Sequence, residues 1–397
     1  MLKDLFPIFS EHPSLIYLDT AATAQKPQVV IDAMDQFLAK EYGTVHRALY
    51  QLSAHSTQLY NDVRESVRQF IGANFLEEII FTKGTTDAIN LAANSFGRHF
   101  LEEQDEILVV ETEHHSNLVP WQMICSEKKA ILRPIPVNDR GEVDLDVLEG
   151  LMNDKVKLIA VAHVSNATGA IHPITEIVKI ARRYSAKVFV DGAQSVCHFP
   201  VSVSAMDVDF FAFSAHKMYG PTGVGVLYGK KELLEQMPPY QGGGDMVEKV
   251  SFAKTTYQPI PLKFEAGTPN IVGVIGLGAA IKFLLQLGMN QVAEIETKLF
   301  DYAKTQLLTI SGLGFLCSPT KSASLLSFNC KGCHPMDIGT LLDTRGICVR
   351  TGHLCAQTAL ERFGVSSTIR VSFGIYNTKE DVDLLVSALR EIVEILR

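Results

Sequence analysis

Two stretches decide the fold: Lys187-Val-Phe-Val-Asp191-Gly-Ala-Gln194 and Phe210-Phe-Ala-Phe-Ser214-Ala-His-Lys217. Each begins as an uninterrupted apolar run, which is typical of a strand covered on both faces of a parallel sheet. Each then ends in polar and chemically reactive side chains. Ligands of open α/β sheets bind outside the carboxyl ends of the strands. Asp191 and Lys217 are about one strand-to-strand crossover apart, so we expect both side chains to face one pocket.

Apolar runs and amphipathic segments alternate on both sides of these two stretches. Residues 175–184 show helical spacing, and alternation of this kind predicts crossover connections and a mostly parallel sheet. A loop rich in glycine and proline, Pro238–Asp245, ends the alternation, and beyond it long helical patterns carry a few short strands. The expected strands are Ile79–Thr82, Ile107–Val110, Ile131–Val137, Leu158–His163, Lys187–Val190, Phe210–Phe213, Val224–Tyr228, Leu325–Asn329 and Thr368–Phe373.

This change of character predicts three parts. Residues 21–262 would form a large α/β domain, residues 263–397 a smaller C-terminal α/β domain, and residues 1–20 a segment that packs with the smaller domain. The longest apolar run, Ile271–Ile281, is shorter than the roughly 20 residues that span a bilayer. Its glycines at 273, 276 and 278 indicate a helix packed closely inside the protein.

Composition narrows the class of protein. The 397 residues include 36 basic and 44 acidic side chains, a net charge of −8, and 47% are hydrophobic, which is typical of a globular chain. The acidic balance argues against a nucleic-acid partner, since phosphate binding needs clustered lysine and arginine. Seven cysteines, an odd number, do not form a disulfide scaffold. With no signal peptide or membrane span in the pattern, we expect a cytoplasmic protein without a membrane partner.

The reactive residues match the requirements of pyridoxal phosphate. A lysine amine binds this cofactor covalently, and a carboxylate pairs with its ring nitrogen. The stretch Lys83-Gly-Thr85-Thr86-Asp87 follows a predicted strand and opens a helical pattern, which favours phosphate binding at the helix N-terminus. A Gly-Thr-Thr before a helix is usually only a cap. Combined with Asp191 and Lys217, however, it predicts a pyridoxal phosphate site.

At this level the chain resembles a known family. The stretches around Asp191 and Lys217 are similar to the cofactor motifs of the class V aminotransferase-fold enzymes, which have the fold type I of the pyridoxal phosphate-dependent transferases. Other stretches narrow the resemblance to the SufS-type, or group II, cysteine desulfurases and selenocysteine lyases, and it runs from Tyr17 to the C-terminus. These stretches are Tyr17-Leu-Asp-Thr-Ala-Ala22, Glu113-His-His-Ser-Asn-Leu-Val-Pro-Trp121, Phe264-Glu-Ala-Gly-Thr-Pro-Asn270 and Arg350-Thr-Gly-His-Leu-Cys355.

The resemblance implies a fold and a set of roles. The fold would be a large domain with a mostly parallel seven-stranded sheet and a smaller α/β domain. Lys217 would bind the cofactor, Asp191 would pair with its ring nitrogen, and Gln194 would hydrogen-bond its ring hydroxyl. His115 would stack on the ring and move protons. The phosphate would be held by Thr85, Thr86, Ser214 and His216, and the substrate would be held by Asn166, Arg370, Arg350 and Ala22.

The resemblance also implies a homodimer. Thr268 would reach the phosphate site of the neighbouring subunit, and the segment Thr44-Val-His-Arg47 would extend toward the opposite site in a similar way. Each active site would then be incomplete in a monomer. Closed two-fold symmetry is the commonest arrangement of soluble oligomers.

Cys355 is the predicted nucleophile. It lies in a polar loop that contains glycine, near a histidine and an arginine, and such surroundings favour the thiolate. The resemblance implies that it attacks the substrate sulfur and carries a persulfide, and Thr351 and Gly352 would let it swing between substrate and acceptor. The chain departs from the family pattern at two positions, because Leu354 replaces a histidine and Thr358 stands where proline is common.

The other six cysteines have no predicted role. Cys330-Lys-Gly-Cys333-His334 matches the pattern of c-type haem attachment, but no export signal accompanies it and it follows an apolar strand. A zinc site is disfavoured because no second cysteine pair follows at ligand spacing, so we expect no metal. His334-Pro335 more simply begins a helix. The remaining cysteines lie in apolar stretches and are expected in the core: Cys125, Cys197, Cys317 and Cys348.

The predicted function is that of a cysteine desulfurase. It would convert L-cysteine to L-alanine, leave a persulfide on Cys355, and pass the sulfur to an acceptor of the SufE or SufU type for iron–sulfur cluster assembly. A selenocysteine lyase is the nearest alternative, because selenium leaves more readily than sulfur. Another class V enzyme is a more distant one, against which Cys355 argues. A scaffold without activity is disfavoured by the intact set of Lys217, Asp191, His115, Cys355 and Arg370.

Overall fold

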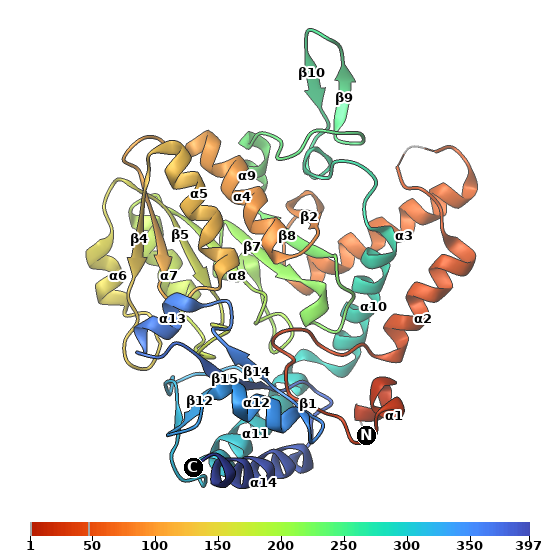
Figure 1. The fold of residues 1–397 in the computed structure, drawn as a ribbon. Coiled ribbons are helices and arrows are strands. Elements are labelled where there is room, and N and C mark those ends of the chain that lie inside the picture. Colours follow the sequence, from red (N-terminus) through yellow and green to blue (C-terminus); the bar gives the residue numbers. More distant parts are fainter. Residues whose placement is uncertain (1, 47) are drawn as a thin grey trace.

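The computed structural model describes residues 2–46 and 48–397. Figure 1 shows a large sheet flanked by helices, a smaller sheet below it, and both chain ends beside the smaller part. Among the described residues, no single helix is long and apolar enough to cross a membrane, and only the bent pair of helices 271–287 and 289–307 reaches that length and composition together.

The large sheet has seven strands in the order β2-β8-β7-β6-β5-β3-β4. All neighbouring strands are parallel except at β8, which runs antiparallel to both β7 and β2. The mostly parallel sheet is therefore confirmed, and each of its predicted strands is present with ends that differ by at most two residues. The strands are β2 (Ile79–Thr82), β3 (Glu106–Val110), β4 (Ile131–Ile135), β5 (Val156–Ala162), β6 (Lys187–Asp191), β7 (Phe210–Ser214) and β8 (Gly225–Gly229).

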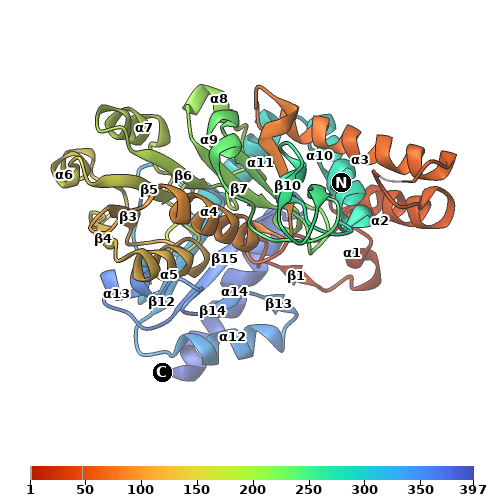
Figure 2. The ribbon, with the colours of Figure 1, turned by 90° about the horizontal axis from the view of Figure 1, so that it is seen from above.

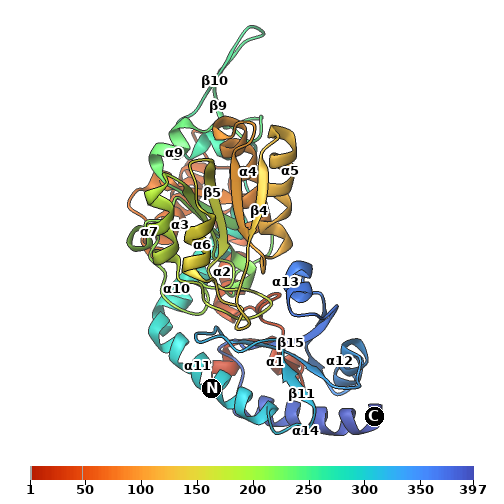
Figure 3. The same ribbon diagram turned by 90° about the vertical axis from the view of Figure 1, so that its left-hand side faces the viewer.

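Helices cover both faces of this sheet, as Figure 3 shows from the side. Successive strand residues point to opposite faces. In β3, accordingly, Ile107 and Val109 lie in one apolar cluster while Leu108 and Val110 lie in another. One face is covered by α4 (Thr85–Phe100) and α5 (Val119–Lys128), and the other by α3 (Gln51–Phe70), α7 (Ile174–Arg183) and α8 (Val203–Met206). Short helices α6 (Leu145–Leu151) and α9 (Lys231–Gln236) flank the sheet.

The predicted apolar helix is α10 (Ile271–Leu287), and it packs against α2 (Gln28–Gln36) and α3. Figure 2 shows these three helices together at one end of the large sheet. A β-carbon added to Gly276 would lie 2.8 Å from the sulfur of Met34, and one added to Gly278 would lie 2.5 Å from Val63. Glycine is thus needed for this close approach.

A buried ion pair ties the segment before α10 to the large sheet. Glu265 accepts from both terminal nitrogens of Arg64 on α3, at 2.6 and 2.8 Å, and both side chains are less than a tenth exposed. Glu265 also accepts the backbone N–H of Phe81 in β2 at 2.8 Å. Buried charges need such complete pairing. Together with the packing of α10, this pair favours a domain boundary near Gly288, later than the predicted boundary at residue 262.

The smaller sheet is antiparallel, in the order β11-β12-β15-β14. Its strands are β11 (Leu313–Phe315), β12 (Leu325–Cys330), β14 (Arg350–Gly352) and β15 (Thr368–Ser372), and its helices are α11 (Met289–Leu307), α12 (Pro335–Asp343), α13 (Gln357–Arg362) and α14 (Lys379–Leu396). His334 caps α12 by accepting the N–H of Met336 at 3.3 Å, as the predicted helix start requires. The thiols of Cys330 and Cys333 are both free.

The N-terminal segment contacts both parts of the molecule. It contains a short helix, α1 (Ile8–Glu11), and β1 (Ile16–Tyr17) pairs in parallel with β13 (Ile347–Cys348). Lys3 forms an ion pair with Asp381 of α14 at 2.9 Å. The ring of Phe6 meanwhile contacts Phe283 of α10 at 6.0 Å between centroids. The segment therefore does not pack with the smaller domain alone.

A two-stranded hairpin projects from the body after the predicted loop at 238–245. It consists of β9 (Val247–Val250) and β10 (Thr255–Tyr257), and Figures 1 and 3 show it extending away from the rest of the chain. The side chain of Phe252 at its turn is fully exposed. Nothing in the sequence pattern distinguished this hairpin from an ordinary loop.

Two buried histidines lie behind the sheet end that carries Asp191. The backbone N–H of His163 donates to the carbonyl of Asp191 at 2.8 Å, and the backbone N–H of His172 donates to the carbonyl of His163 at 2.9 Å. Burial lowers the pKa of each imidazole from 6.5 to about 4. Among the described residues, neither ring nitrogen of His172 has a hydrogen-bond partner.

These pKa values predict a loss of stability in mild acid. The folded protein binds fewer protons than the unfolded chain, so stability present above pH 6.5 is lost as the pH falls toward 4. For a histidine with these pKa values, the loss between pH 7 and pH 5 is about 2 kcal/mol. Urea titrations at pH 7 and pH 5 measure this loss in the wild type and in His172→Leu. We expect the free energy of unfolding to fall by about 2 kcal/mol less in His172→Leu than in the wild type, because the variant lacks this imidazole. An equal fall in the free energy of unfolding of the wild type and of His172→Leu would contradict a lowered pKa for His172.

Candidate active site

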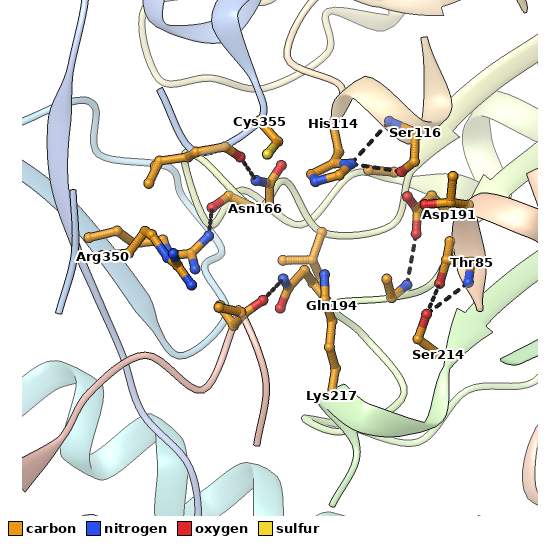
Figure 4. A pocket seen from close by; sticks show the side chains of 18 of the residues that line it. Thr85, His114, Ser116, Asn166, Asp191, Gln194, Ser214, Lys217, Arg350 and Cys355 are labelled. Atoms are coloured by element: carbon orange, nitrogen blue, oxygen red, sulfur yellow. Dashed lines mark hydrogen bonds between the residues drawn. The ribbon is translucent and has the colours of Figure 1, made fainter. Parts of the chain in front are cut away.

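A cavity of about 460 Å³ opens at the carboxyl ends of the strands of the large sheet, next to the smaller domain. Figure 4 shows side chains from both domains pointing into it. All of the predicted site residues line this cavity except His115 and Thr268. Those that line it are Ala22, Thr85, Thr86, Asn166, Asp191, Gln194, Ser214, His216, Lys217, Arg350, Cys355 and Arg370.

Lys217 and Asp191 both line the cavity, as expected from the sequence. Lys217 ends a short 3-10 turn (Ala215–Lys217) directly after β7, and Asp191 ends β6. Burial lowers the pKa of the Lys217 amine, although the charge of Asp191 opposes this shift. Burial also raises the pKa of the Asp191 carboxyl, which accepts the N–H of Ala193 at 2.9 Å. A lysine with a lowered pKa keeps more of its amine unprotonated and nucleophilic.

The start of α4 forms an anion site beside Lys217. Ser214 accepts the backbone N–H of Thr85 at 2.8 Å, and the two hydroxyls are 2.7 Å apart. A β-carbon on Gly225 would lie 2.4 Å from the Cα of Gly84, so the two backbones meet closely below the turn. Helix N-termini with such hydroxyls bind phosphate groups. The predicted phosphate role of Thr85 and Ser214 therefore agrees with their placement.

The expected position of the ring-stacking histidine is wrong by one residue. His114 lines the cavity, whereas His115 does not, and the ring of His115 lies 5.6 Å from that of His353. Alternate residues of this turn point in different directions, which two adjacent histidines in a sequence do not reveal. Figure 4 shows His114 beside Ser116 and near Asp191. We therefore assign the role expected of His115 to His114, as a proposal.

The hydrogen bonds of His114 fix its tautomer. Its Nδ1 accepts the backbone N–H of Ser116 at 3.1 Å and lies 2.7 Å from the Ser116 hydroxyl. Burial, together with the charge of Lys217, lowers the pKa of His114 to about 3. The ring is therefore neutral and carries its proton on Nε2. The Glu113 carboxylate beneath it accepts the side chain of Asn117 and the N–H of Ala162, each at 2.6 Å.

Two arginines share one aspartate at the other end of the cavity. Asp19 contacts Arg370 at 3.2 Å and Arg350 at 2.8 Å. Arg370 also donates to the carbonyl of Asn166 at 3.1 Å, and its buried Nε has no hydrogen-bond partner among the described residues. Two guanidinium groups against one carboxylate leave positive charge for an anionic substrate group. Asp19 lies in the stretch Tyr17–Ala22, but no sequence pattern indicated a role for it.

Sequence reasoning also missed Lys26. Its amine donates to the carbonyls of Ala24 and His216 at 2.5 and 3.1 Å, and burial lowers its pKa to about 8. It thereby holds the backbone next to Lys217. The sequence feature that could have indicated Lys26 is its short distance along the chain from the stretch 17–22. A lysine after a loop, however, is usually a surface residue.

Cys355 is the most exposed of the seven thiols, all of which are free. The predicted core cysteines Cys125 and Cys197 are buried, whereas Cys317 and Cys348 are only half-buried. Among the described residues, no group of three or more histidine, cysteine or acidic side chains could hold a metal ion. Cys355 lines the cavity although it belongs to the smaller domain.

The residues of the cavity fit pyridoxal phosphate. The side-chain oxygen of Gln194 is buried and has no hydrogen-bond partner within residues 2–46 and 48–397, while its nitrogen donates to the carbonyl of Ala21 at 2.7 Å. An aspartate for the ring nitrogen, an amine for the aldehyde and a helix N-terminus for the phosphate surround the same space. Lys217, Asp191 and Thr85 would therefore hold the cofactor.

Residues 16–385 match the family model for class-V aminotransferases. This chain belongs to the class-V aminotransferase family. Family membership confirms the predicted resemblance, the fold class and the cofactor, pyridoxal phosphate. The match covers both domains, so neither is an unrelated addition to the class-V fold.

Three relatives within the class-V family are named as cysteine desulfurases. A cysteine desulfurase of Shigella sonnei is 46% identical over 98% of this chain and 97% of its own length. A probable cysteine desulfurase of Mycolicibacterium paratuberculosis is 45% identical over 99% of this chain. The crystal structure of the cysteine desulfurase CsdA of Escherichia coli has a TM-score of 0.94 at 41% identity, covering 100% of this chain and 98% of that one.

Some relatives are longer than this chain. It spans 58% of the Mycolicibacterium protein, 64% of a probable cysteine desulfurase of Mycobacterium leprae, and 62% of a cysteine desulfurase of Synechococcus elongatus. The class-V fold is therefore shared over the whole of this chain but over only about three-fifths of those proteins.

Thr268 and the segment 44–47 were predicted to serve a neighbouring subunit. Thr268 is exposed and does not line the cavity. Thr44 and His46 lie in the described part of the chain, but Arg47 of the same predicted segment is outside the described residues. The homodimer thus stays a prediction.

Proposed function

We propose that the protein is a cysteine desulfurase that converts L-cysteine to L-alanine and leaves a persulfide on Cys355. One observation carries this proposal: the exposed thiol of Cys355 and the buried amine of Lys217 line the same cavity. A transaminase needs the lysine but has no use for a cysteine at that place. The names of the relatives agree with this function.

The two arginines orient the substrate. Arg370 and Arg350 would bind the cysteine carboxylate, and the Nε–H of Arg370 has no partner in the part of the chain that the structure describes. The backbone carbonyl of Asn166 accepts from the guanidinium of Arg370, which keeps the group from rotating away. A carboxylate fixed at one end and an amine fixed near Lys217 place the substrate sulfur on the side of Cys355.

The cofactor and the chain divide the chemistry between them. Bound pyridoxal phosphate supplies an electron sink that weakens the bonds of the substrate at Cα and, in turn, between Cβ and sulfur. Burial lowers the pKa of the Lys217 amine, which favours its unprotonated form, and this amine would take the Cα proton. His114 is neutral and offers an N–H from Nε2.

Cys355 then completes the sulfur transfer. Its sulfur attacks the substrate sulfur, a new S–S bond forms, and the Cβ–S bond breaks with its electron pair remaining on carbon. The carbon takes up a proton, and the organic product leaves as alanine. Cysteine and one thiol thus give alanine and one persulfide, with no other oxidant or reductant required.

The remaining proposals concern partners and setting. The exposure of Cys355 supports transfer of its sulfur to an acceptor protein of the SufE or SufU type for iron–sulfur cluster assembly. The exposed Thr268 supports a homodimer in which it serves the neighbouring phosphate site. The seven free cysteines support a location in the reducing cytoplasm.

The test is a product balance on the protein loaded with pyridoxal phosphate. After incubation with L-cysteine, we expect alanine in the solution and one added sulfur atom on the Cys355 peptide by mass spectrometry. A reduced acceptor protein should raise alanine formation and remove the added sulfur. Formation of pyruvate in place of alanine, or added sulfur on another cysteine, would overturn the assignment. Selenocysteine in place of cysteine tests the lyase alternative in the same assay.

A further inference from the structure

The turn that carries Cys355 has an unusual backbone. Leu354 and Cys355 have φ angles of 56° and 53°, so two successive residues with side chains occupy the left-handed region. Such residues adopt this region rarely, and they persist there only where surrounding contacts hold them. The sequence predicted a mobile loop at this place, so these contacts need to be identified.

Two imidazoles accept backbone N–H groups of this turn. The Nε2 of His115 accepts the N–H of Gln357 at 3.3 Å, and the Nδ1 of His353 accepts the N–H of Cys355 at 3.1 Å. The backbone N–H of His115 in turn donates to the carbonyl of Cys355 at 2.7 Å. His115 belongs to the large domain, so it bonds the turn of the smaller domain at the nucleophile itself and at the residue two positions after it.

The acceptor role requires both rings to be neutral, since a protonated imidazole only donates. Partial burial and the neighbouring His353 lower the pKa of His115, which favours its neutral form. The two rings are 5.6 Å apart and inclined by 33°. The ring Nε2 and the backbone N–H of His115 therefore both bond to the backbone of the turn, and His115 does not line the cavity.

A second attachment secures the residue before Cys355. Asn166 donates its side-chain N–H to the carbonyl of Leu354 at 2.7 Å, and Figure 4 shows this bond next to Cys355. The Leu354 side chain is 7% exposed and packs in an apolar cluster with Ala167 and Leu360. The leucine that replaces the expected histidine thus anchors the turn by burial.

We propose that His115 is a positioning residue for the Cys355 thiol: by accepting from Gln357 and donating to Cys355, it holds the turn that directs the nucleophile into the cavity. His115 acts from outside the cavity and does not contact the cofactor. This inference rests on the proposed role of Cys355 in sulfur transfer, and it gives the second histidine of the pair a function distinct from that of His114.

Two replacements of His115 separate its hydrogen bond from its bulk. His115→Gln keeps an acceptor oxygen at the reach of Nε2, while His115→Met has a similar length without an acceptor of comparable strength. We expect His115→Met to slow persulfide formation in a single turnover by about tenfold to a hundredfold, because misplacing a reacting group has effects of that size. We expect His115→Gln to stay within about threefold of the wild type.

A second measurement reports on the turn itself. Amide hydrogen exchange in the peptide that covers residues 353–360 should be faster in His115→Met and nearly unchanged in His115→Gln. The visible absorbance and affinity of the bound cofactor should be unchanged in both, which a ring-stacking role for His115 would not allow. Persulfide formation at the wild-type rate in His115→Met, or loss of cofactor binding there, would overturn the proposal.

The design keeps this inference separate from the proposed function. If Cys355→Ser still forms alanine from cysteine, the sulfur-transfer role of Cys355 fails, and the positioning of Cys355 loses its meaning for catalysis. If Cys355→Ser is inactive while His115→Met forms persulfide normally, only the positioning role of His115 fails.

Discussion

Lys217→Ala will lose the covalently bound cofactor and nearly all activity. Lys217 is the only lysine that lines the cavity among the described residues, and it would both hold the cofactor and take the Cα proton. A general base alone contributes about a hundredfold to ten-thousandfold. Because one residue fills both roles, we expect alanine formation to fall by at least about a thousandfold.

Lys83 provides a matched control for this change. It lies at the start of the turn before α4 and its side chain is exposed. Lys83→Ala should keep the visible absorbance of the cofactor, and borohydride reduction of the wild type should place the cofactor on the Lys217 peptide. Recovery of the cofactor on the Lys83 peptide would refute the site.

Cys355→Ser will keep the cofactor but stop the desulfuration of cysteine. The residues proposed to hold the cofactor, Lys217, Asp191 and Ser214, lie at the ends of strands of the large sheet or directly after them, whereas Cys355 belongs to a separate turn of the smaller domain. A serine hydroxyl is a far weaker nucleophile toward sulfur than a thiolate. We expect the rate of alanine formation from cysteine to drop by more than about a hundredfold, with the absorbance spectrum unchanged.

Selenocysteine distinguishes attack by Cys355 from simple departure of the leaving atom. Selenium leaves carbon more readily than sulfur, so alanine formation from selenocysteine should survive in Cys355→Ser at least partly. Cys333→Ser serves as the control, because Cys333 is half-buried at the end of β12 and does not line the cavity. Unchanged cysteine turnover in Cys355→Ser would remove this residue from the mechanism.

The large sheet could be predicted closely because its strands are long and apolar on both faces. Runs such as Phe210–Ser214 leave little choice of structure, and their ends are marked by polar residues. The short strands β1, β13 and β14 were not predicted, since two or three residues carry no periodic signal. The close packing of α10 was predicted from its glycines.

The residues expected at strand ends, Asp191 and Lys217, line the cavity, whereas His115, in an irregular turn, does not. Asp191 and Lys217 follow from the geometry of a parallel sheet. The choice between His114 and His115 depends on the backbone angles of a three-residue turn, which no sequence pattern fixes. The turn at Cys355 was expected to be mobile because it contains glycine, yet contacts from distant parts of the chain, His115 and Asn166, hold it.

The ion pairs of Asp19 with Arg350 and Arg370 determine when the substrate site can form during synthesis of the chain. Asp19 emerges from the ribosome early, while both arginines that it contacts, Arg350 and Arg370, emerge near the end of synthesis. Domains generally fold as units during translation, so the large sheet can form while the last residues are still being added. The substrate site closes only after that. A nascent chain therefore cannot begin turnover before its translation is almost complete.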